Sequence, residues 1–327
     1  MTGTPAHNIL DAFSSDFKRI EQVLERHFSS HISFVNEISR HILFANGKRI
    51  RPLLTVCSAR LCGLETDDVF DLSAVPEYLH AASLLHDDVV DGGEMRRGVP
   101  PAYKVWGNSP AVLVGDYLYA KAIGLATKFG NVEIAAEIAS TVGLMAEGEI
   151  IQLLHAKQPS FDEKTYTDII YRKTAALIST SCRIGALLAN ASASQEEAVS
   201  NYGLNLGKAF QLIDDVLDYT ADESELGKAI GTDLAEGKLT LPIVIAVEEA
   251  EDQDSKRLLS IMGHGHPSDS DMKWVRDLLR HTGAIDYTKE KARSLILSAC
   301  DSLDVFEKSE TRELLKALAL FVLERRR

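Results

Sequence analysis

The sequence HAASLLHDDVVD (80–91) ends in a cluster of aspartates, and AFQLIDDVLD (209–218) repeats that ending later in the chain. In each stretch an apolar run with helical spacing leads into the pattern DDxxD. We call these patterns the first aspartate motif (87–91) and the second aspartate motif (214–218). The two stretches predict two helices, each carrying several carboxylates at one end.

The spacing of the aspartates indicates a metal site. Positions i and i+4 share one face of a helix, so each motif offers a pair of carboxylates to one ion. Carboxylates beside apolar residues repel one another unless a cation neutralises them, and oxygen ligands alone favour Mg²⁺ over Zn²⁺. One such motif is also typical of a solvated helix cap; the second copy favours the metal. The candidate residues are Asp87, Asp88, Asp91, Asp214, Asp215 and Asp218.

Composition sets limits on the partners. The 327 residues include 35 Lys and Arg against 48 Asp and Glu, a formal net charge of −13, which argues against nucleic acid as a ligand. The four cysteines show no zinc-ligand spacing and lie in apolar stretches, as reduced thiols in the cytoplasm do. No stretch reaches the length of a membrane span.

The fold class follows from periodicity. Apolar residues recur three and four positions apart through most of the chain, and sustained alternation is absent. We therefore predict an all-α fold of long helices, a helical bundle around a central cavity. Because no change in composition divides the chain, residues 1–327 are expected to form a single large domain.

Basic residues near the motifs would complement a phosphate ligand, which Mg²⁺ neutralises only in part. His80 lies two helical turns before Asp87 and points the same way, although a buried structural histidine fits equally well. Lys173 lies in an apolar helix, where its ammonium either meets an anion or extends to solvent. Other candidates lie in the basic segment GKRIRP (47–52), which alone could be a surface patch, and in two glycine-containing segments that follow the motifs. These are Lys48, Arg51, Arg96, Arg97, Lys228 and Lys238.

Taken together, these segments resemble the trans-isoprenyl (polyprenyl) diphosphate synthases over nearly the whole chain, in the order of that family. Two further stretches, AVLVGDYL (111–118) and MAEGEIIQL (145–153), resemble the long-chain, octaprenyl-type bacterial members. The segments that carry the resemblance are GKRIRP (47–52), HAASLLHDDVVDGGEMRRG (80–98), YRKTA (171–175), FQLIDDVLDY (210–219) and GKAIGTDLAEGKLTLP (227–242).

The resemblance implies a role for each candidate. Asp87, Asp91 and Asp214 would hold two or three Mg²⁺ ions, and the remaining aspartates of the motifs would act through water or neighbouring ligands. The diphosphate of isopentenyl diphosphate, the homoallylic substrate, would be bound by Lys48, Arg51, His80 and Arg97. The allylic diphosphate would be bound by Arg96, Lys173, Thr174, Gln211 and Lys228.

The resemblance also implies the reaction and its product. Lys173, Lys228 and the aspartates would assist ionisation of the allylic diphosphate, to which isopentenyl units are added head-to-tail. Ser83 lies one turn before Asp87, and it and Ala82 are small, so a growing chain could pass them. This predicts a long all-trans product of about 40 carbons, within a range of about C35–C50, in an apolar tunnel.

Several alternatives remain open at this stage. A terpene cyclase or head-to-head prenyl synthase would also carry aspartate motifs, but would not need the GKRIRP segment or the Arg96-Arg97 pair. A non-catalytic subunit of a heteromeric synthase would usually have lost a motif. The resemblance implies a homodimer. The basic tip Arg325-Arg326-Arg327 could touch an anionic membrane transiently during product release, or its helix could simply pack on the core.

Overall fold

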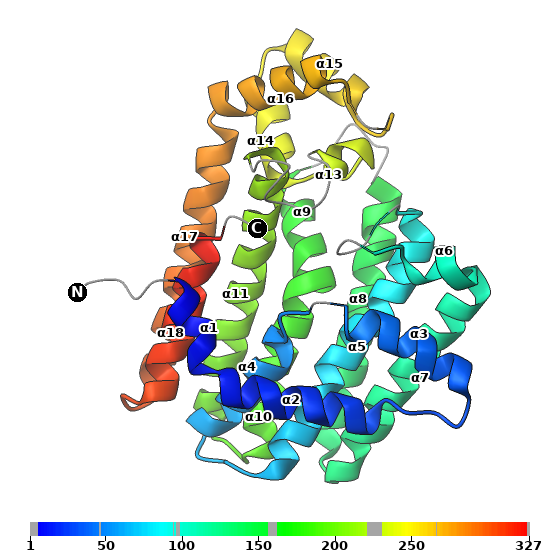
Figure 1. The fold of residues 1–327 in the computed structure, drawn as a ribbon. Coiled ribbons are helices and arrows are strands. Elements are labelled where there is room, and N and C mark those ends of the chain that lie inside the picture. The colour runs from blue at the N-terminus through cyan, green and yellow to red at the C-terminus, as the bar shows by residue number, and fades with distance from the viewer. Residues whose placement is uncertain are drawn as a thin grey trace. The chain divides into compact units, whose positions relative to one another are not determined.

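The computed structural model describes residues 6–45, 47–93, 95, 99–155, 162–220, 231–265 and 267–325. Every regular element in these residues is a helix, and no β-strand occurs among them (Figure 1). The predicted all-α fold is therefore confirmed. Within the same residues, no helix is long and apolar enough to cross a membrane.

The chain groups into two compact units, each assembled from three separate segments. Unit 1 comprises Met1–Gly143, Leu177–Gly203 and Ser302–Leu318, and unit 2 comprises Leu144–Ala176, Leu204–Asp301 and Ala319–Arg327. The expectation that residues 1–327 form a single domain remains a prediction.

Helix α5 is the centre of unit 1, where it packs against α2, α3, α4, α6 and α7. Its middle section is buried almost without interruption and includes the large side chains Leu72, Tyr78 and Leu79. The helices that lie wholly or partly in this unit are α1 (Ala6–Ala12), α2 (Ser14–His27), α3 (Ser33–Leu43), α4 (Ile50–Leu61), α5 (Asp67–Asp91), α6 (Ala102–Trp106), α7 (Asn108–Ala126), η1 (Thr127–Phe129), α8 (Val132–His155), α10 (Ala176–Leu188), α11 (Ala193–Thr220), η3 (Leu303–Val305) and α18 (Glu310–Leu323).

Local sequence explains where α5 begins and ends. Asp67 and Asp68 occupy its first turn, where the helix dipole favours negative charge. Gly92 follows the last residue with φ of +66°, a left-handed conformation that glycine adopts without strain. The helix spans 25 residues, as long as the periodicity predicts. The first aspartate motif therefore occupies its final turns.

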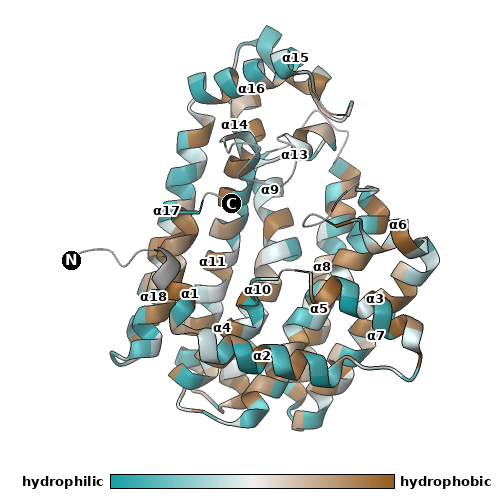
Figure 2. Ribbon diagram, viewed as in Figure 1, coloured by the Kyte–Doolittle hydropathy of each residue, from teal (hydrophilic) through white to brown (hydrophobic). Residues whose placement is uncertain are grey.

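Unit 2 is organised around the short apolar helix α14, which packs against α9, α15 and α16. Residues Leu241–Ala246 of α14 are buried, and Figure 2 shows this helix largely in brown, whereas α16 carries much teal. Besides parts of α8, α11 and α18, the unit contains α9 (Glu163–Ile170), the π-helix η2 (Tyr171–Ala175), α13 (Thr232–Ala235), α14 (Leu241–Glu249), α15 (Asp252–Ile261), α16 (Asp269–His281) and α17 (Ala284–Ser302).

Candidate active site

Both aspartate motifs lie at the carboxyl ends of their helices. The first occupies the last turns of α5, and the second occupies the last turns of α11. The helix dipole places partial negative charge at this end, which makes a cluster of carboxylates there unfavourable. Neither helix has a basic residue in its last turn to offset that charge. A cation that binds the motifs would remove the cost.

The candidates on α5 differ in exposure. Asp88 is buried, Asp87 is half-buried and Asp91 is exposed, so the motif spans the boundary between core and solvent. One turn earlier, Ser83 is half-buried and its hydroxyl donates to the backbone oxygen of His80 at 2.9 Å. Ala82 is fully buried. Of the two proposed chain-length residues, Ser83 thus has the more open surroundings.

Lys48 and Arg51 lie at the start of α4, which packs directly on α5. Lys48 is exposed, and Arg51 and His80 are half-buried. These three candidates for the homoallylic substrate thus lie on, or two residues before, the contacting helices α4 and α5 of unit 1. Arg96, Arg97 and Lys228 lie outside the described residues.

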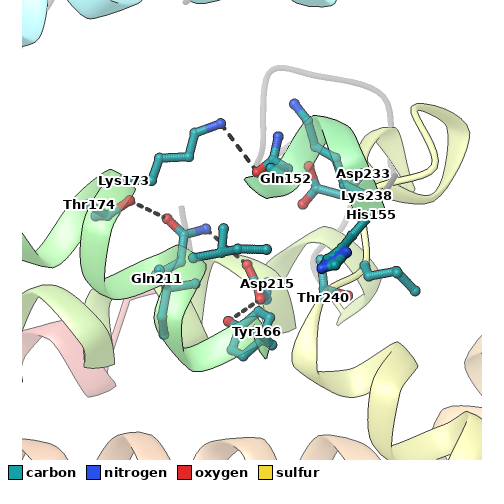
Figure 3. Close-up of a pocket in the computed structure, with 13 residues that line it drawn as sticks. Gln152, His155, Tyr166, Lys173, Thr174, Gln211, Asp215, Asp233, Lys238 and Thr240 are labelled. Atoms are coloured by element: carbon teal, nitrogen blue, oxygen red, sulfur yellow. Dashed lines mark hydrogen bonds between the residues drawn. The ribbon is translucent and has the colours of Figure 1, made fainter. Parts of the chain in front are cut away.

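A cavity of about 180 Å³ in unit 2 brings together five of the predicted residues, Lys238 among them (Figure 3). Lys173 and Thr174 reach it from η2, and Gln211 and Asp215 reach it from α11. The remaining lining residues are Gln152, His155, Tyr166, Ile169, Ile170, Asp233, Lys238, Leu239 and Thr240. Polar and charged groups thus line one side of the cavity, beside apolar side chains of α9.

Lys173 and Thr174 lie on a π-helical segment rather than on a regular α-helix. Such segments occur often at functional sites, because they turn neighbouring side chains away from the regular helical positions. Lys173 forms an ion pair with Glu149 at 2.6 Å, and its ammonium also donates to Gln152 at 3.3 Å. Gly148 permits this approach, because a Cβ there would lie 3.0 Å from the backbone nitrogen of Lys173. The Lys173 ammonium is therefore paired with a carboxylate of the protein, and its contact with a diphosphate remains a prediction.

A chain of hydrogen bonds connects η2 to the second aspartate motif (Figure 3). The Thr174 hydroxyl donates to the Gln211 side-chain oxygen at 3.1 Å, and the Gln211 amide donates to Asp215 at 2.9 Å. Tyr166 donates its phenolic hydrogen to the other oxygen of Asp215 at 2.5 Å. Burial, aided by the negative charge of Asp233, raises the pKa of Asp215 to about 8 although both donors lower it.

Asp214 is engaged by an arginine from the end of the chain. Arg325 lies 3.0 Å from the Asp214 carboxylate, and its guanidinium stacks 4.2 Å from the centre of the Phe210 ring. Its side chain is only 10% exposed. This basic residue is therefore packed against α11, which agrees with the interpretation of a helix packed on the core. Membrane contact by the C-terminal tip remains a prediction.

The donor set of the two motifs suits a magnesium ion. Each motif contributes carboxylate oxygens only, and the backbone nitrogen of Asp233 donates to Asp218 at 3.1 Å, which orients that carboxylate. Across the described ranges, no group of three or more His, Cys, Asp or Glu side chains could hold a metal ion by itself. Mg²⁺ commonly takes one or two carboxylates and completes its shell with water and substrate phosphate, so the carboxylates of either motif are ligands that it could use.

The structure also adds residues that the sequence interpretation missed. Tyr166 lies seven residues before Lys173, two turns away along the same segment, and this spacing could have identified it. Glu149 and Gln152 lie in a stretch singled out only for its resemblance to long-chain synthases. No local signal connects Arg325 with Asp214, which lies more than one hundred residues earlier.

The fold is all-helical, and a cluster of carboxylates lies at the end of α5 and another at the end of α11. This combination is typical of the class of helical enzymes that act on diphosphate esters. Comparison with known families identifies the group within that class. Residues 32–279 match the model of the family described as polyprenyl synthetase.

Individual relatives agree over nearly the full chain. Octaprenyl diphosphate synthase of Escherichia coli (strain K12) is 34% identical over 96% of this chain and 97% of its own. A short chain isoprenyl diphosphate synthase of Methanothermobacter thermautotrophicus is 37% identical over 88% and 89%. The crystal structure of a polyprenyl synthase from Caulobacter crescentus CB15, complexed with calcium and isoprenyl diphosphate, superposes with a TM-score of 0.93 at 34% identity, over 100% of this chain and 99% of that one.

The chain therefore belongs to the polyprenyl synthetase family, and it is a polyprenyl diphosphate synthase, a transferase of prenyl groups. The family resemblance inferred from the sequence motifs is confirmed. The relatives include both long-chain and short-chain synthases, so family membership alone does not fix the length of the product.

Proposed function

We propose that the protein adds isopentenyl diphosphate units head-to-tail to an allylic diphosphate, such as farnesyl diphosphate, in a Mg²⁺-dependent reaction. The observation that carries this proposal is the position of both aspartate motifs at the negative ends of long helices, with Lys173 and Thr174 beside the second. Each motif needs cations to offset its negative charge, and bound cations would in turn favour a highly charged anion such as a diphosphate.

The allylic diphosphate is the group that the unit 2 residues would hold. The Lys173 ammonium neutralises part of its charge, and the Thr174 hydroxyl and Gln211 amide orient its oxygens, assisted by Lys228 and Arg96. Mg²⁺ held by Asp87, Asp91 and Asp214, in two or three ions, would stabilise the negative charge that develops as diphosphate leaves. The allylic C–O bond then breaks heterolytically, leaving a delocalised carbocation.

Isopentenyl diphosphate would be held by Lys48, Arg51, His80 and Arg97. Its double bond attacks the allylic carbon that lost the diphosphate, and a new C–C bond forms. A proton then leaves the adjacent carbon, for which the released diphosphate is the nearest base, and the product is longer by one isopentenyl unit. Apolar walls protect the cation from water, which would convert it to an alcohol.

We propose a long-chain all-trans product of about 40 carbons, within about C35–C50, because Ser83 and Ala82 leave room for a growing chain. The half-buried position of Ser83 on the face of Asp87 supports this choice. The similarity to an octaprenyl diphosphate synthase supports it as well.

We also propose that the enzyme is a homodimer of the cytoplasm. Exposed apolar residues lie along α7, where Leu113 is 66% exposed, and along α8, where Leu154 is 64% exposed. A second copy that covered such faces would remove apolar surface from water. The cysteines lie in the described part of the chain and form no disulfide, which is consistent with a reducing compartment.

Substitution of one proposed metal ligand tests the function. Asp87→Ala should lower incorporation of radiolabelled isopentenyl diphosphate by about 10³-fold or more, because it removes stabilisation of the leaving group. The matched control is Asp68→Asn, which removes an exposed carboxylate from the other end of the same helix and should leave incorporation nearly unchanged. Near-normal incorporation by a correctly folded Asp87→Ala protein would contradict the assignment.

A further inference from the structure

Arg49 is the residue of the GKRIRP segment to which the proposed reaction gives no role. It lies between Lys48 and Arg51, yet its side chain is buried, with 5% exposure. Its backbone has φ of +52° and ψ of +30°, the left-handed conformation, directly before the first residue of α4. Residues other than glycine and asparagine adopt this conformation rarely and at a cost in backbone energy.

Two glutamates hold the Arg49 side chain. Its Nε donates to Glu21 of α2 at 2.6 Å, and its Nη1 donates to Glu77 of α5 at 2.8 Å. Glu77 is itself buried, whereas Glu21 is partly exposed. Burial alone would lower the pKa of Arg49, but the two glutamates raise it above its ordinary value, so the guanidinium remains charged. The forked guanidinium bonds both carboxylates at once.

These contacts join the start of α4 to two other helices. On α5, Glu77 lies one turn before His80. The backbone oxygen of Arg49 also accepts from Leu53 at 3.1 Å, which closes the first turn of α4. The Arg49 side chain points inward and is held by the two glutamates. Lys48 precedes this fixed residue and is exposed, and Arg51 follows it by two positions.

Stability alone is a weak explanation for this arrangement. A buried ion pair often contributes less to stability than apolar residues of the same volume, and a left-handed backbone adds a further cost. A glycine or asparagine would start α4 without either cost. The buried ion pair and the left-handed backbone both occur at Arg49, which lies in the sequence between Lys48 and Arg51. Those two residues are assigned to the homoallylic substrate. Strained, buried polar groups of this kind concentrate where the geometry of a binding site must be fixed.

We propose that Arg49 is a positioning residue whose double ion pair with Glu21 and Glu77 fixes the left-handed turn that presents Lys48 and Arg51 to the diphosphate of the homoallylic substrate. This inference rests on the proposed function, because it assigns that substrate to the start of α4. It assigns no contact between Arg49 and substrate.

The test compares Arg49→Lys and Arg49→Asn with a matched control. Lysine keeps the charge but lacks the planar fork that holds the two glutamates in a fixed geometry, and asparagine tolerates the left-handed backbone but carries no charge. The control is Arg60→Lys, because Arg60 lies at the other end of α4 and forms a similar double hydrogen bond, at 2.8 and 3.1 Å, with Asp16 of α2. All three variants weaken an anchor of α4, but only the first two act beside Lys48.

We expect both Arg49 variants to raise the KM for isopentenyl diphosphate by about 10- to 100-fold, the scale on which small displacements of a binding group act. The KM for the allylic substrate should stay within about threefold, since Lys173, Thr174 and Gln211, three of the residues assigned to it, lie in the other unit. Arg60→Lys should lower the thermal midpoint without changing either KM. Binding of isopentenyl diphosphate alone, measured by calorimetry, should weaken in parallel with its KM.

Three results would overturn the inference: an unchanged KM for isopentenyl diphosphate in the Arg49 variants, an equal rise for both substrates, or the same rise in Arg60→Lys. If Arg49→Lys and Arg49→Asn do not fold, Glu21→Gln provides the same test, because it removes only the more exposed ion pair. A wild-type protein that incorporates no isopentenyl units would overturn the proposed function and this inference together. Normal wild-type elongation with unaltered variants would overturn the inference alone.

Discussion

The ion pair between Arg325 and Asp214 predicts competition with magnesium. If Asp214 is a metal ligand, a Mg²⁺ ion must displace the guanidinium that lies 3.0 Å from its carboxylate. Replacing Arg325 by glutamine removes the competing charge. The variant should therefore bind Mg²⁺ more tightly than the wild-type protein in the absence of substrate.

The size of this effect follows from the exposure of the two side chains. Asp214 is 39% exposed, so solvent screens the ion pair and its contribution is about 1 kcal/mol. Loss of about 1 kcal/mol of competition lowers the Mg²⁺ concentration at half-saturation about fivefold. Arg325→Lys keeps a positive charge near Asp214 and should therefore change the half-saturating Mg²⁺ concentration by less than Arg325→Gln.

Thermal unfolding at increasing Mg²⁺ concentrations measures this binding without turnover, because an ion that binds the folded state raises the midpoint. A control variant, Arg280→Gln, removes an arginine from the exposed ion pair with Asp277 and should leave the Mg²⁺ dependence unchanged. An equal or higher half-saturating Mg²⁺ concentration in Arg325→Gln would contradict competition between Arg325 and Mg²⁺ for Asp214. It would indicate that Arg325 supports the metal site instead of competing for it.

Two further predictions concern the product and the pH dependence of folding. Ser83→Phe should shorten the longest product by several isoprene units while turnover stays within about tenfold, because an aromatic ring would narrow the path beside Asp87. The control is Ser73→Ala, a substitution on the same helix. If chromatography shows unchanged product sizes for Ser83→Phe, the wall that limits the product lies elsewhere. In the folded, metal-free protein the pKa of Asp215 is raised from its ordinary value of 3.8 to about 8. The neutral carboxyl therefore contributes fully to the free energy of unfolding at pH values below 3.8. This contribution is lost as the pH rises through about 8. Across that window the wild-type protein should lose up to several kcal/mol of unfolding free energy relative to Asp215→Asn, and urea titrations that showed the same pH dependence in both proteins would contradict the raised pKa.

Much of the fold could be predicted because its signals are local. The three- and four-residue periodicity identified the long helices, among them α5 with 25 residues. The helical spacing within each aspartate motif depends only on neighbours along the chain, and the structure places both motifs on helices as predicted.

The rest of the site depends on contacts that sequence spacing does not encode. The π-helical form of residues 171–175 arises where α8 approaches closely at Gly148, so a regular helical pattern could not reveal it. The contact of Arg325 with Asp214 joins distant parts of the chain. Burial of Arg49, in a segment that reads as a basic surface patch, depends on glutamates from two other helices.

Elongation of an allylic diphosphate by isopentenyl units can be measured directly. The most direct test incubates the purified protein with Mg²⁺, radiolabelled isopentenyl diphosphate and farnesyl diphosphate, and sizes the products with and without EDTA. We expect a ladder of intermediates that ends at one long product of about 40 carbons and disappears with EDTA. Absence of incorporation with this primer and with a shorter one, by a folded protein supplied with Mg²⁺, would contradict it.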